Sequence, residues 1–271
     1  MNNNFKYDLK MFIHDFDPTI FTIGFLEIRW YSLSYIFGII FGWYLGKKYL
    51  KKIFNTNNII NQNSNDIFDD LITYIIIAVI LGGRLGYIIF YDLTYYLNSP
   101  TSMLKIWEGG MSFHGALIGI IITCYIFSKK HGLNFFHLAD VVACVAPIGL
   151  FFGRIANFIN SELYGYPTKQ SWGVVFPTVD DQPRHPSQLY EALLEGLLLF
   201  LILNIVFKFY RYKEGKCSYL FLFFYGFFRI ISEIFRQPDE QIGLLFNSLS
   251  MGSLLSILMI IFSLIIFKKT R

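Results

Sequence analysis

Apolar residues gather along this chain in seven blocks, each close to the roughly 20 residues that a helix needs to cross a bilayer. Polar and charged residues separate the blocks and are scarce inside them. The predicted spans are roughly 26–46, 70–91, 112–129, 137–156, 188–208, 217–236 and 247–267. We therefore expect an all-α polytopic membrane protein of about seven transmembrane helices, with residues 1–271 forming a single integral-membrane domain.

The composition favours the same fold class. Hydrophobic residues make up 54% of the chain and charged residues only 15%, whereas a soluble domain carries about 25% charged residues. Membrane lipids are therefore expected around the protein. No soluble basic domain is present, so nucleic acid is not expected as a partner.

Basic residues predict how the spans are oriented. Those that follow spans one, three, five and seven are Lys47, Lys48, Lys51, Lys52, Lys129, Lys130, Lys208, Arg211, Lys213, Lys216, Lys268, Lys269 and Arg271. The opposite loops hold fewer basic residues, spread over longer segments. Because lysine and arginine collect on the cytoplasmic side, we expect the N-terminus outside and the C-terminus in the cytoplasm.

The longest outer connection joins spans four and five and covers residues 157–187. It contains Pro167, Pro177, Pro183 and Pro186, and proline interrupts helices. We expect a small outer-face loop region of ordered turns or short strands there.

Unusual polar residues lie at the outer ends of the spans. Arg154 and Asn157 lie at the end of span four and share a helix face. In span six, polar residues recur at spacings of four, four and three residues and so form one stripe: Tyr225, Arg229, Glu233 and Arg236. The predicted topology places the following polar and aromatic residues in the outer half of the membrane or at its outer face: Tyr31, His114, Arg154, Asn157, Glu162, Tyr225, Arg229, Glu233 and Arg236. A charge at membrane depth costs on the order of 3 kcal/mol. These arginines therefore indicate an anionic ligand, a partner charge, or both.

Each candidate also has a purely structural interpretation. Arg154 and Arg229 can pair with glutamates and merely join helices. The candidate partners are Glu162, Glu191 and Glu233, and Glu195 lies one turn beyond Glu191 in span five. His114 can bond backbone groups at an interface, and Tyr31 can belong to the aromatic belt.

Two further membrane-embedded charges favour structural roles. Arg84 has Gly82, Gly83 and Gly86 around it, and small residues suit close helix packing, so we expect a structural pair. Asp140 lies on the inner side, and the fourteen residues to Arg154 correspond to about 21 Å of helix. It is therefore expected to be remote from any outer site.

The sequence lacks the motifs of several common types of active site. Residues 110–114 resemble a nucleophile elbow, but His114 replaces its second glycine and no aspartate on the same face completes a triad. There is no HExxH or CxxC motif for a metal. Neither a P-loop nor a GxGxxG motif is present, so no nucleotide is implied.

With these residues in place, the chain resembles the prolipoprotein diacylglyceryl transferase family. Residues 153–165 fit the pattern G-R-x-[GA]-N-F-x-N-x-E-x-x-G at every fixed position. Supporting matches occur at 109–115, 184–191 and 225–233. Ala116 departs from the pattern, because the family usually has a second glycine there.

The resemblance implies a specific reaction. The family transfers the diacylglyceryl group of phosphatidylglycerol to the lipobox cysteine in the signal peptide of a lipoprotein precursor. A thioether forms and glycerol phosphate leaves. The resemblance implies no metal or soluble cofactor, and it places the protein in a bacterial cytoplasmic (inner) membrane.

The resemblance also assigns residue roles. Arg154 and Arg229 are expected to bind the phosphate and stabilise its charge. His114 is the candidate base, although the field of the arginines could generate the thiolate unaided. The remaining residues expected to bind substrate are Tyr31, Asn157, Asn160, Glu162, Gly165, Tyr225, Glu233 and Arg236.

A different class of function stays open. An anion or lipid transporter could use Arg154 and Arg229 as a binding site. Transporters usually show inverted repeats and broken helices near the midplane, and no such repeat is evident here. An intramembrane protease is disfavoured because no serine–histidine pairing is apparent.

Overall fold

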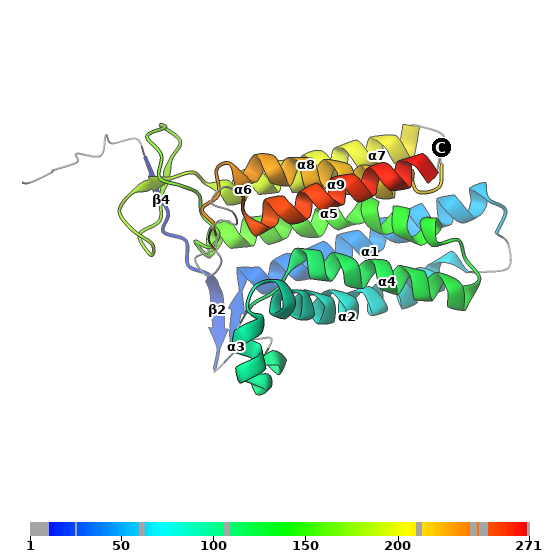
Figure 1. Cartoon of the computed structure of the whole chain (residues 1–271), viewed down its shortest axis with the longest axis horizontal. Helices are drawn as coiled ribbons and strands as arrows, with labels where there is room; N and C mark the ends of the chain where they lie inside the picture. The colour runs from blue at the N-terminus through cyan, green and yellow to red at the C-terminus, as the bar shows by residue number, and fades with distance from the viewer. Residues whose placement is uncertain are drawn as a thin grey trace, which may run out of the picture.

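The computed structural model describes residues 11–24, 26–59, 63–105, 109–209, 213–238, 243 and 249–269. Within these residues, long helices run alongside one another as a single bundle (Figure 1). They are α1 (Trp30–Thr56), α2 (Ser64–Phe90), α4 (Phe113–His131), α5 (Phe135–Ile159), α8 (Lys216–Glu233) and α9 (Met251–Lys269). A further continuous helical segment consists of α6 (Ser187–Glu191), the π-helical stretch η3 (Ala192–Leu198) and α7 (Leu199–Phe209).

Length and composition make this a helical multi-pass membrane protein. In the described part of the chain, five segments are long and apolar enough to cross a membrane: α2, α4, α5, residues 187–209 and α9. All seven predicted spans overlap a helix, but α1 and α8 fall short of that criterion. The lysines Lys47, Lys48, Lys51 and Lys52 lie within α1, and α8 contains Lys216, Arg229 and Glu233. The count of seven spans thus rests on the sequence pattern.

The start of the first span was predicted wrongly. Residues Leu26–Arg29 form strand β3, which pairs antiparallel with β2 (Thr19–Ile23), and the helix begins only at Trp30. Apolar and charged residues alternate from Leu26 to Arg29, which is the pattern of a strand rather than a helix. The average hydrophobicity of the segment concealed this alternation.

The sixth span also ends earlier than predicted. Helix α8 stops at Glu233, because the backbone N–H groups of Phe235 and Arg236 both donate to the carbonyl of Ser232. Arg236 then forms an isolated antiparallel bridge with Gly165. It therefore lies one turn beyond the helix that carries Arg229.

Close packing of α2 on α4 depends on glycine. A Cβ atom added to Gly86 would lie 2.5 Å from the Cα of Gly115, and one added to Gly119 would lie 2.7 Å from the carbonyl oxygen of Ala78. Arg84 extends from this interface and donates to five backbone carbonyls, those of Ser102, Met103, Lys105, Gly109 and Gly110. Its structural role is confirmed, but its partners are carbonyls instead of the expected charged side chain.

The two ends of the bundle differ in character. One end carries β1 (Phe12–Ile13), β4 (Val174–Val175) and β5 (Pro183–Arg184), which form a sheet in the order β1-β4-β5. The β2–β3 hairpin, α3 (Leu93–Asn98) and η1 (Pro100–Leu104) project sideways at this same end, and the C-terminus lies at the other (Figure 1). Residues 160–186 form turns and two short strands, as their prolines predict.

Asp140 lies towards the C-terminal end of the bundle, as expected. It is completely buried, and its carboxylate accepts hydrogen bonds from the backbone N–H groups of Gly215 and Ser218 and from the Ser218 hydroxyl. An acidic side chain stabilises the first turn of a helix. Asp140 thus holds the start of α8 against α5 and takes no part in the opposite end.

Candidate functional site

Three arginines and three glutamates form a buried ion-pair cluster where α5, α6, η3 and the end of α8 meet. Glu191 lies at its centre. Its Oε2 is 2.8 Å from Arg154 Nε, and its Oε1 is 3.0 Å from Arg229 Nη1 and 3.2 Å from Arg236 Nη1. We call this group the arginine–glutamate cluster; its members are Arg154, Glu191, Glu195, Arg229, Glu233 and Arg236.

Glu195 and Glu233 complete the pairing. Glu195 Oε2 is 3.3 Å from Arg154 Nη2, and its Oε1 is 3.5 Å from Arg229 Nη1. Arg229 Nη2 pairs with Glu233 one turn along α8. Side chains Glu191 and Glu195 are fully buried, so each depends on the arginines for compensation of its charge.

Local helix geometry brings Glu195 into the cluster. The helix changes from α6 to the π-helical η3 directly after Glu191, and π turns are frequent at functional sites. Gly196 lets η3 approach α5 closely, because a Cβ there would lie 2.7 Å from the Cα of Phe151. That approach places Glu195 beside Arg154, which lies one turn further along α5 than Phe151.

Arg154 and Arg229 each keep one guanidinium nitrogen that has no partner in the described part of the chain. Arg154 uses Nε and Nη2, and Arg229 uses Nη1 and Nη2, in the pairs given above. Arg154 Nη1 and Arg229 Nε make no hydrogen bond to the described residues. A small cavity of about 50 Å³ adjoins Arg229, Glu233 and Arg236 and reaches Ser250 and Gly252 at the start of α9. The cluster can therefore offer N–H donors to an anion without breaking its glutamate pairs.

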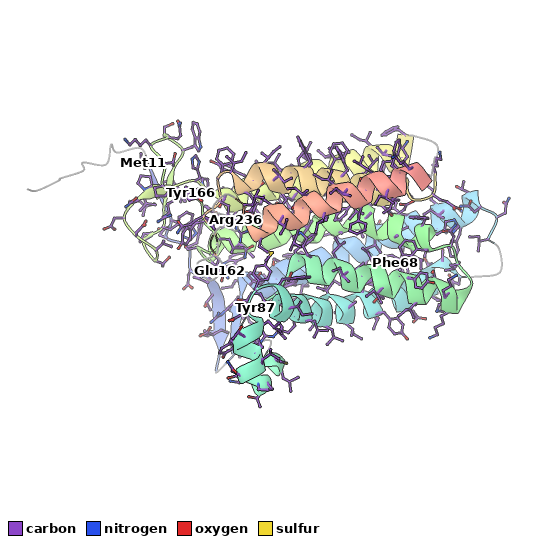
Figure 2. All side chains as sticks on the ribbon, viewed as in Figure 1. Met11, Phe68, Tyr87, Glu162, Tyr166 and Arg236 are labelled. Atoms are coloured by element: carbon purple, nitrogen blue, oxygen red, sulfur yellow. The ribbon has the colours of Figure 1, made fainter. Side chains whose placement is uncertain are left out.

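A second polar group lies next to the cluster. Glu162 accepts hydrogen bonds from Asn157 Nδ2 at 3.1 Å and from Asn160 Nδ2 at 3.3 Å. The flanking residues Ser161 and Leu163 have φ values of 57° and 56°, and such positive φ angles in non-glycine residues often mark functional sites. Figure 2 shows Glu162 and Arg236 at the same end of the bundle.

Helix α6 ties this group to the cluster. Gln188 Nε2 donates to the backbone carbonyl of Glu162 at 2.5 Å, and Ser187 Oγ donates to that of Leu163 at 2.8 Å. Gln188 precedes Glu191 by three residues on the same face of the helix. The Glu162 loop and the arginines are therefore fixed by one short helix.

Tyr225 on α8 and His114 on α4 lie near the cluster, and both contact the ring of Phe113 on α4. The ring of Tyr225 is almost fully buried and stacks on Phe113 with centroids 4.2 Å apart. His114 follows Phe113 at the start of α4 and is buried; neither ring nitrogen has a hydrogen-bond partner among the described residues. The charges of Arg229 and Glu233 act on its imidazole. The backbone-bonded interface role considered for His114 therefore has no contact in the described chain to support it.

Tyr31 and Gly165 lie at the margin of this arrangement. Tyr31 is half-buried and packs on Tyr35 with centroids 5.3 Å apart, and the charge of Glu162 acts on Tyr35. No described contact joins Tyr31 to the arginines. A Cβ on Gly165 would lie 2.5 Å from the carbonyl oxygen of Phe235 and 2.6 Å from that of His185. Gly165 thus permits close backbone packing next to Arg236.

Arg184 connects the outer strands to the end of α8. It is buried, and it donates through Nη1 to the carbonyl of Gly165 at 3.1 Å and to Gln237 Oε1 at 2.5 Å. Its Nη2 lies 2.6 Å from Asp180 Oδ2, and this guanidinium holds the pKa of the Asp180 carboxyl below its usual range. Burial lowers the pKa of the neighbouring His185.

Glu191 and Glu195 have a larger role in the structure than sequence reasoning assigns to them. The sequence suggests Glu191 only as a possible helix-locking partner and assigns Glu195 no partner, yet together they join all three arginines of the cluster. The available signal was two carboxylates one turn apart within an apolar span. Intramembrane carboxylates are costly, and this pair had no basic neighbour on its own helix.

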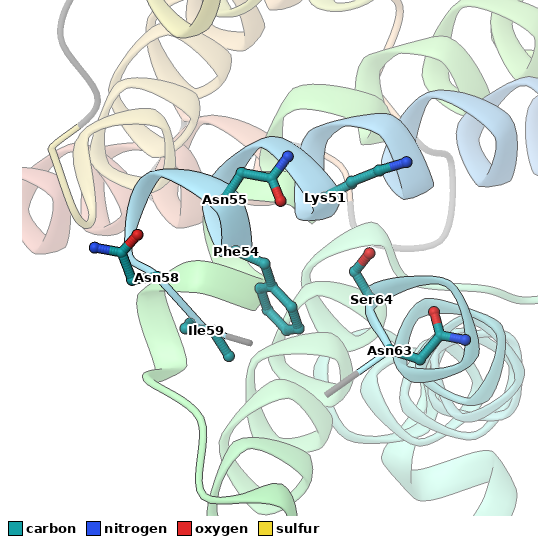
Figure 3. Close-up of a pocket in the computed structure, with 7 residues that line it drawn as sticks. All are labelled: Lys51, Phe54, Asn55, Asn58, Ile59, Asn63 and Ser64. Carbon is teal, nitrogen blue, oxygen red and sulfur yellow. The ribbon is translucent and has the colours of Figure 1, made fainter. Parts of the chain in front are cut away.

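A larger cavity lies at the opposite end of the bundle, away from the cluster. It has a volume of about 470 Å³ and is lined by Lys51, Phe54, Asn55, Asn58, Ile59, Asn63 and Ser64 (Figure 3). Its lining residues Ile59 and Asn63 flank, in the sequence, residues 60–62, which lie outside the described part of the chain. We therefore assign it no site.

Comparison with known proteins shows the family of the chain. Residues 18–268 match the family model of prolipoprotein diacylglyceryl transferase. A phosphatidylglycerol–prolipoprotein diacylglyceryl transferase of Rickettsia bellii is 52% identical over 257 residues, covering 94% of this chain and 95% of that protein.

Two further relatives carry the same name. The protein of Rickettsia typhi is 50% identical over 250 residues, covering 91% of this chain and 93% of its own length. That of Rickettsia canadensis is 49% identical over 253 residues, covering 93% of this chain and 95% of its own length. These matches confirm the resemblance carried by residues 153–165. The chain belongs to the prolipoprotein diacylglyceryl transferase family.

Proposed function

We propose that this enzyme transfers the diacylglyceryl group of phosphatidylglycerol to the lipobox cysteine thiol of a lipoprotein precursor. Family membership and the names of its relatives support a phosphatidylglycerol–prolipoprotein diacylglyceryl transferase activity. The single observation that carries the proposal is the arginine–glutamate cluster. It provides fixed guanidinium donors at the end of an apolar bundle, where the phosphate of a lipid can reach them.

Arg154 and Arg229 bind the lipid phosphate in this mechanism. Arg154 is fixed by two glutamates and Arg229 by three, and each keeps one nitrogen without a partner in the described chain: Nη1 of Arg154 and Nε of Arg229. Charge-assisted N–H donors that are already in position stabilise charge as it develops on an oxygen. The glutamates therefore orient the arginines, and the free donors serve the phosphate.

The reaction is a displacement at carbon. The thiolate sulfur attacks the glyceryl carbon that bears the phosphate, so a carbon–sulfur bond forms as the carbon–oxygen bond breaks. The bonding electrons pass to the phosphate oxygen, and glycerol phosphate leaves. Its charge rises during this step, and the arginines stabilise that increase.

His114 takes the thiol proton. A free cysteine has a pKa near 8.5 and is mostly protonated at neutral pH, so the reaction needs a base or a cationic field. His114 is buried beside the charges of Arg229 and Glu233, and its ring nitrogens have no partner in the described chain. A nitrogen without a partner can accept the proton and later release it to the departing phosphate.

The remaining residues position the lipid headgroup. Asn157 and Asn160 hold Glu162 beside the cluster, and Tyr225 closes its apolar side. Tyr31 forms an outer wall near Glu162. Gly165 acts through packing, because its close backbone contacts set the position of the Gly165–Arg236 bridge.

The cluster faces the outer side of a bacterial inner membrane. Strand β1 (Phe12–Ile13) and the loop that carries β4 lie at the cluster end of the bundle, and the C-terminus lies at the other. The distribution of lysine and arginine supports a cytoplasmic C-terminus. An engineered cysteine near Lys51 should resist an impermeant reagent added outside sealed cells. Labelling there would contradict this orientation.

The direct test combines purified protein, phosphatidylglycerol vesicles and a signal-peptide substrate with its lipobox cysteine. The peptide should gain the mass of one diacylglyceryl group, with glycerol phosphate released in equal amount. An anion or lipid transporter that uses the same arginines would leave the peptide mass unchanged. That result would contradict the proposed function.

A further inference from the structure

Two buried polar side chains beside the arginine–glutamate cluster have an oxygen without a hydrogen-bond partner in the described chain. They are Gln188, through Oε1, and Ser232, through Oγ. Both side chains are fully buried. Buried polar groups are nearly always hydrogen-bonded, and each exception needs an explanation. An unsatisfied buried oxygen is costly unless a ligand or water completes it.

The orientation of the Gln188 amide follows from its contact with the Glu162 loop. Its nitrogen lies 2.5 Å from the carbonyl oxygen of Glu162, and only an NH₂ group can donate there. The amide oxygen must therefore lie on the other side of the group. Gln188 shares its helix face with Glu191 one turn away, and Glu191 contacts all three arginines.

Ser232 occupies the corresponding place on α8. Glu191 Oε1 contacts both Arg229 Nη1 and Arg236 Nη1, at 3.0 and 3.2 Å. Ser232 lies between those arginines along the chain, and the backbone N–H of Arg236 donates to its carbonyl. Residues three apart on a helix share a face, so Ser232 lies on the face of α8 that Glu191 contacts.

We infer that Gln188 and Ser232 recognise the hydroxyl groups of the lipid headgroup and so make the enzyme selective for a polyol phosphodiester. This inference rests on the proposed function and adds a specificity to it. An amide oxygen accepts a hydrogen bond, and a serine hydroxyl both donates and accepts. The arginines recognise the phosphate that all phospholipids share. Two neutral oxygens that accept hydrogen bonds fit the hydroxyl donors of a glycerol headgroup and leave a headgroup without hydrogen-bond donors poorly matched.

The test compares two lipids with identical acyl chains. Phosphatidylglycerol carries two headgroup hydroxyls, and phosphatidylpropanol keeps the phosphodiester but has none. A site that hydrogen-bonds a substrate hydroxyl rejects the analogue that lacks it. The wild-type enzyme should prefer phosphatidylglycerol in kcat/KM by at least about tenfold.

Ser232→Ala is the main variant, because alanine is well tolerated in a helix. It should lower the preference at least threefold, through slower transfer from phosphatidylglycerol, with transfer from phosphatidylpropanol unchanged. Gln188→Met should act in the same direction. Ser128→Ala is the matched control: Ser128 is also buried in a helix, but its hydroxyl already donates to the carbonyl of Tyr125 at 2.8 Å. Its preference should equal that of the wild type.

The outcomes separate this inference from the proposed function. Normal transfer by a wild-type enzyme that does not distinguish the lipids would overturn the inference alone. Equal losses with both lipids in Ser232→Ala would also overturn it and leave the serine as a packing residue. Absence of transfer from either lipid by the wild-type protein would overturn the proposed function and the inference together.

Discussion

Glu191 and Arg229 form an ion pair of 3.0 Å between α6 and α8, and the glutamate side chain is fully buried. The same carboxylate group pairs with Arg154 on α5 through its other oxygen, at 2.8 Å. One side chain thus fixes the relative positions of the two arginines to which we assign phosphate binding. The separation of these guanidiniums is set by a protein carboxylate before any lipid arrives.

Replacing Glu191 should therefore damage both folding and catalysis. Glu191→Gln removes the negative charge that Arg154, Arg229 and Arg236 share, and loss of one partner from a buried ion pair costs about 3 to 5 kcal/mol. We expect a large fall in the unfolding temperature measured in detergent. Glu27→Gln is the control, because Glu27 pairs with Arg29 at the exposed β2–β3 hairpin. Equal unfolding temperatures for the two variants would contradict the central position of Glu191.

Gly165 and Gly153 provide a matched pair within residues 153–165. Gly165→Ala would place a Cβ 2.5 Å from the Phe235 carbonyl oxygen, whereas nothing lies within 4 Å of a Cβ at Gly153. We expect Gly165→Ala to lower the free energy of unfolding by about 1 to 3 kcal/mol, the usual cost of overpacking. Gly153→Ala should be close to neutral. Denaturation of both variants in the same detergent measures the difference, and equal stability would refute the packing role of Gly165.

The ion pair of Asp180 and Arg184 predicts a pH dependence. Because this pair lowers the pKa of Asp180 in the folded protein, its stabilising effect is complete above the unfolded pKa of about 3.9. The effect is lost as the pH falls through the lower folded value. Asp180→Asn should thus reduce the unfolding temperature at pH 7, and its difference from the wild type should shrink towards pH 3.

The control for this series is Asp15→Asn, which removes the same charge from an exposed residue. It should leave the unfolding temperature nearly unchanged at both pH values. A deficit in Asp180→Asn that stays constant from pH 7 to pH 3 would show that the pair with Arg184 is not its cause.

The sequence predicted the helices better than their ends, for physical reasons. Apolar length identifies the segments, so α2, α5 and α9 overlap most of the predicted spans 70–91, 137–156 and 247–267. It does not identify the alternation at Leu26–Arg29, which makes a strand. The pairing of β1 with β4 joins residues more than 150 positions apart. No local pattern in two-residue strands predicts such a contact.

The candidate site was predictable where charge conflicted with hydrophobicity. Arg154 and Arg229 were identified because a buried charge is expensive, and the structure brings them to one carboxylate. Gln188 and Ser232 carried no such signal, because neutral polar residues are common in helices. These two residues are candidates because one oxygen of each has no hydrogen-bond partner in the described chain. Hydrogen-bond partners depend on the folded structure and cannot be predicted from the sequence.

His114 should contribute to catalysis without being its only source. His114→Gln removes the proposed proton acceptor, and loss of general-base catalysis slows reactions on the order of 100-fold. We expect such a loss at neutral pH, with partial recovery at higher pH as the substrate thiol ionises unaided. The measurement is a pH–rate profile at saturating lipid. A profile with the shape and height of the wild type would remove His114 from the mechanism.

Arginine-to-lysine variants test the phosphate site most directly. A lysine offers one nitrogen, so it cannot pair with two glutamates and also present a planar donor to phosphate. The quantity to measure is the rate at which a lipobox peptide gains diacylglyceryl mass from phosphatidylglycerol, with Arg29→Lys at the exposed hairpin as the control. We predict that Arg154→Lys and Arg229→Lys each lose about 100-fold in this rate, while Arg29→Lys retains wild-type transfer. Near-normal transfer by either folded cluster variant would contradict phosphate binding by that arginine and leave it as a helix tether.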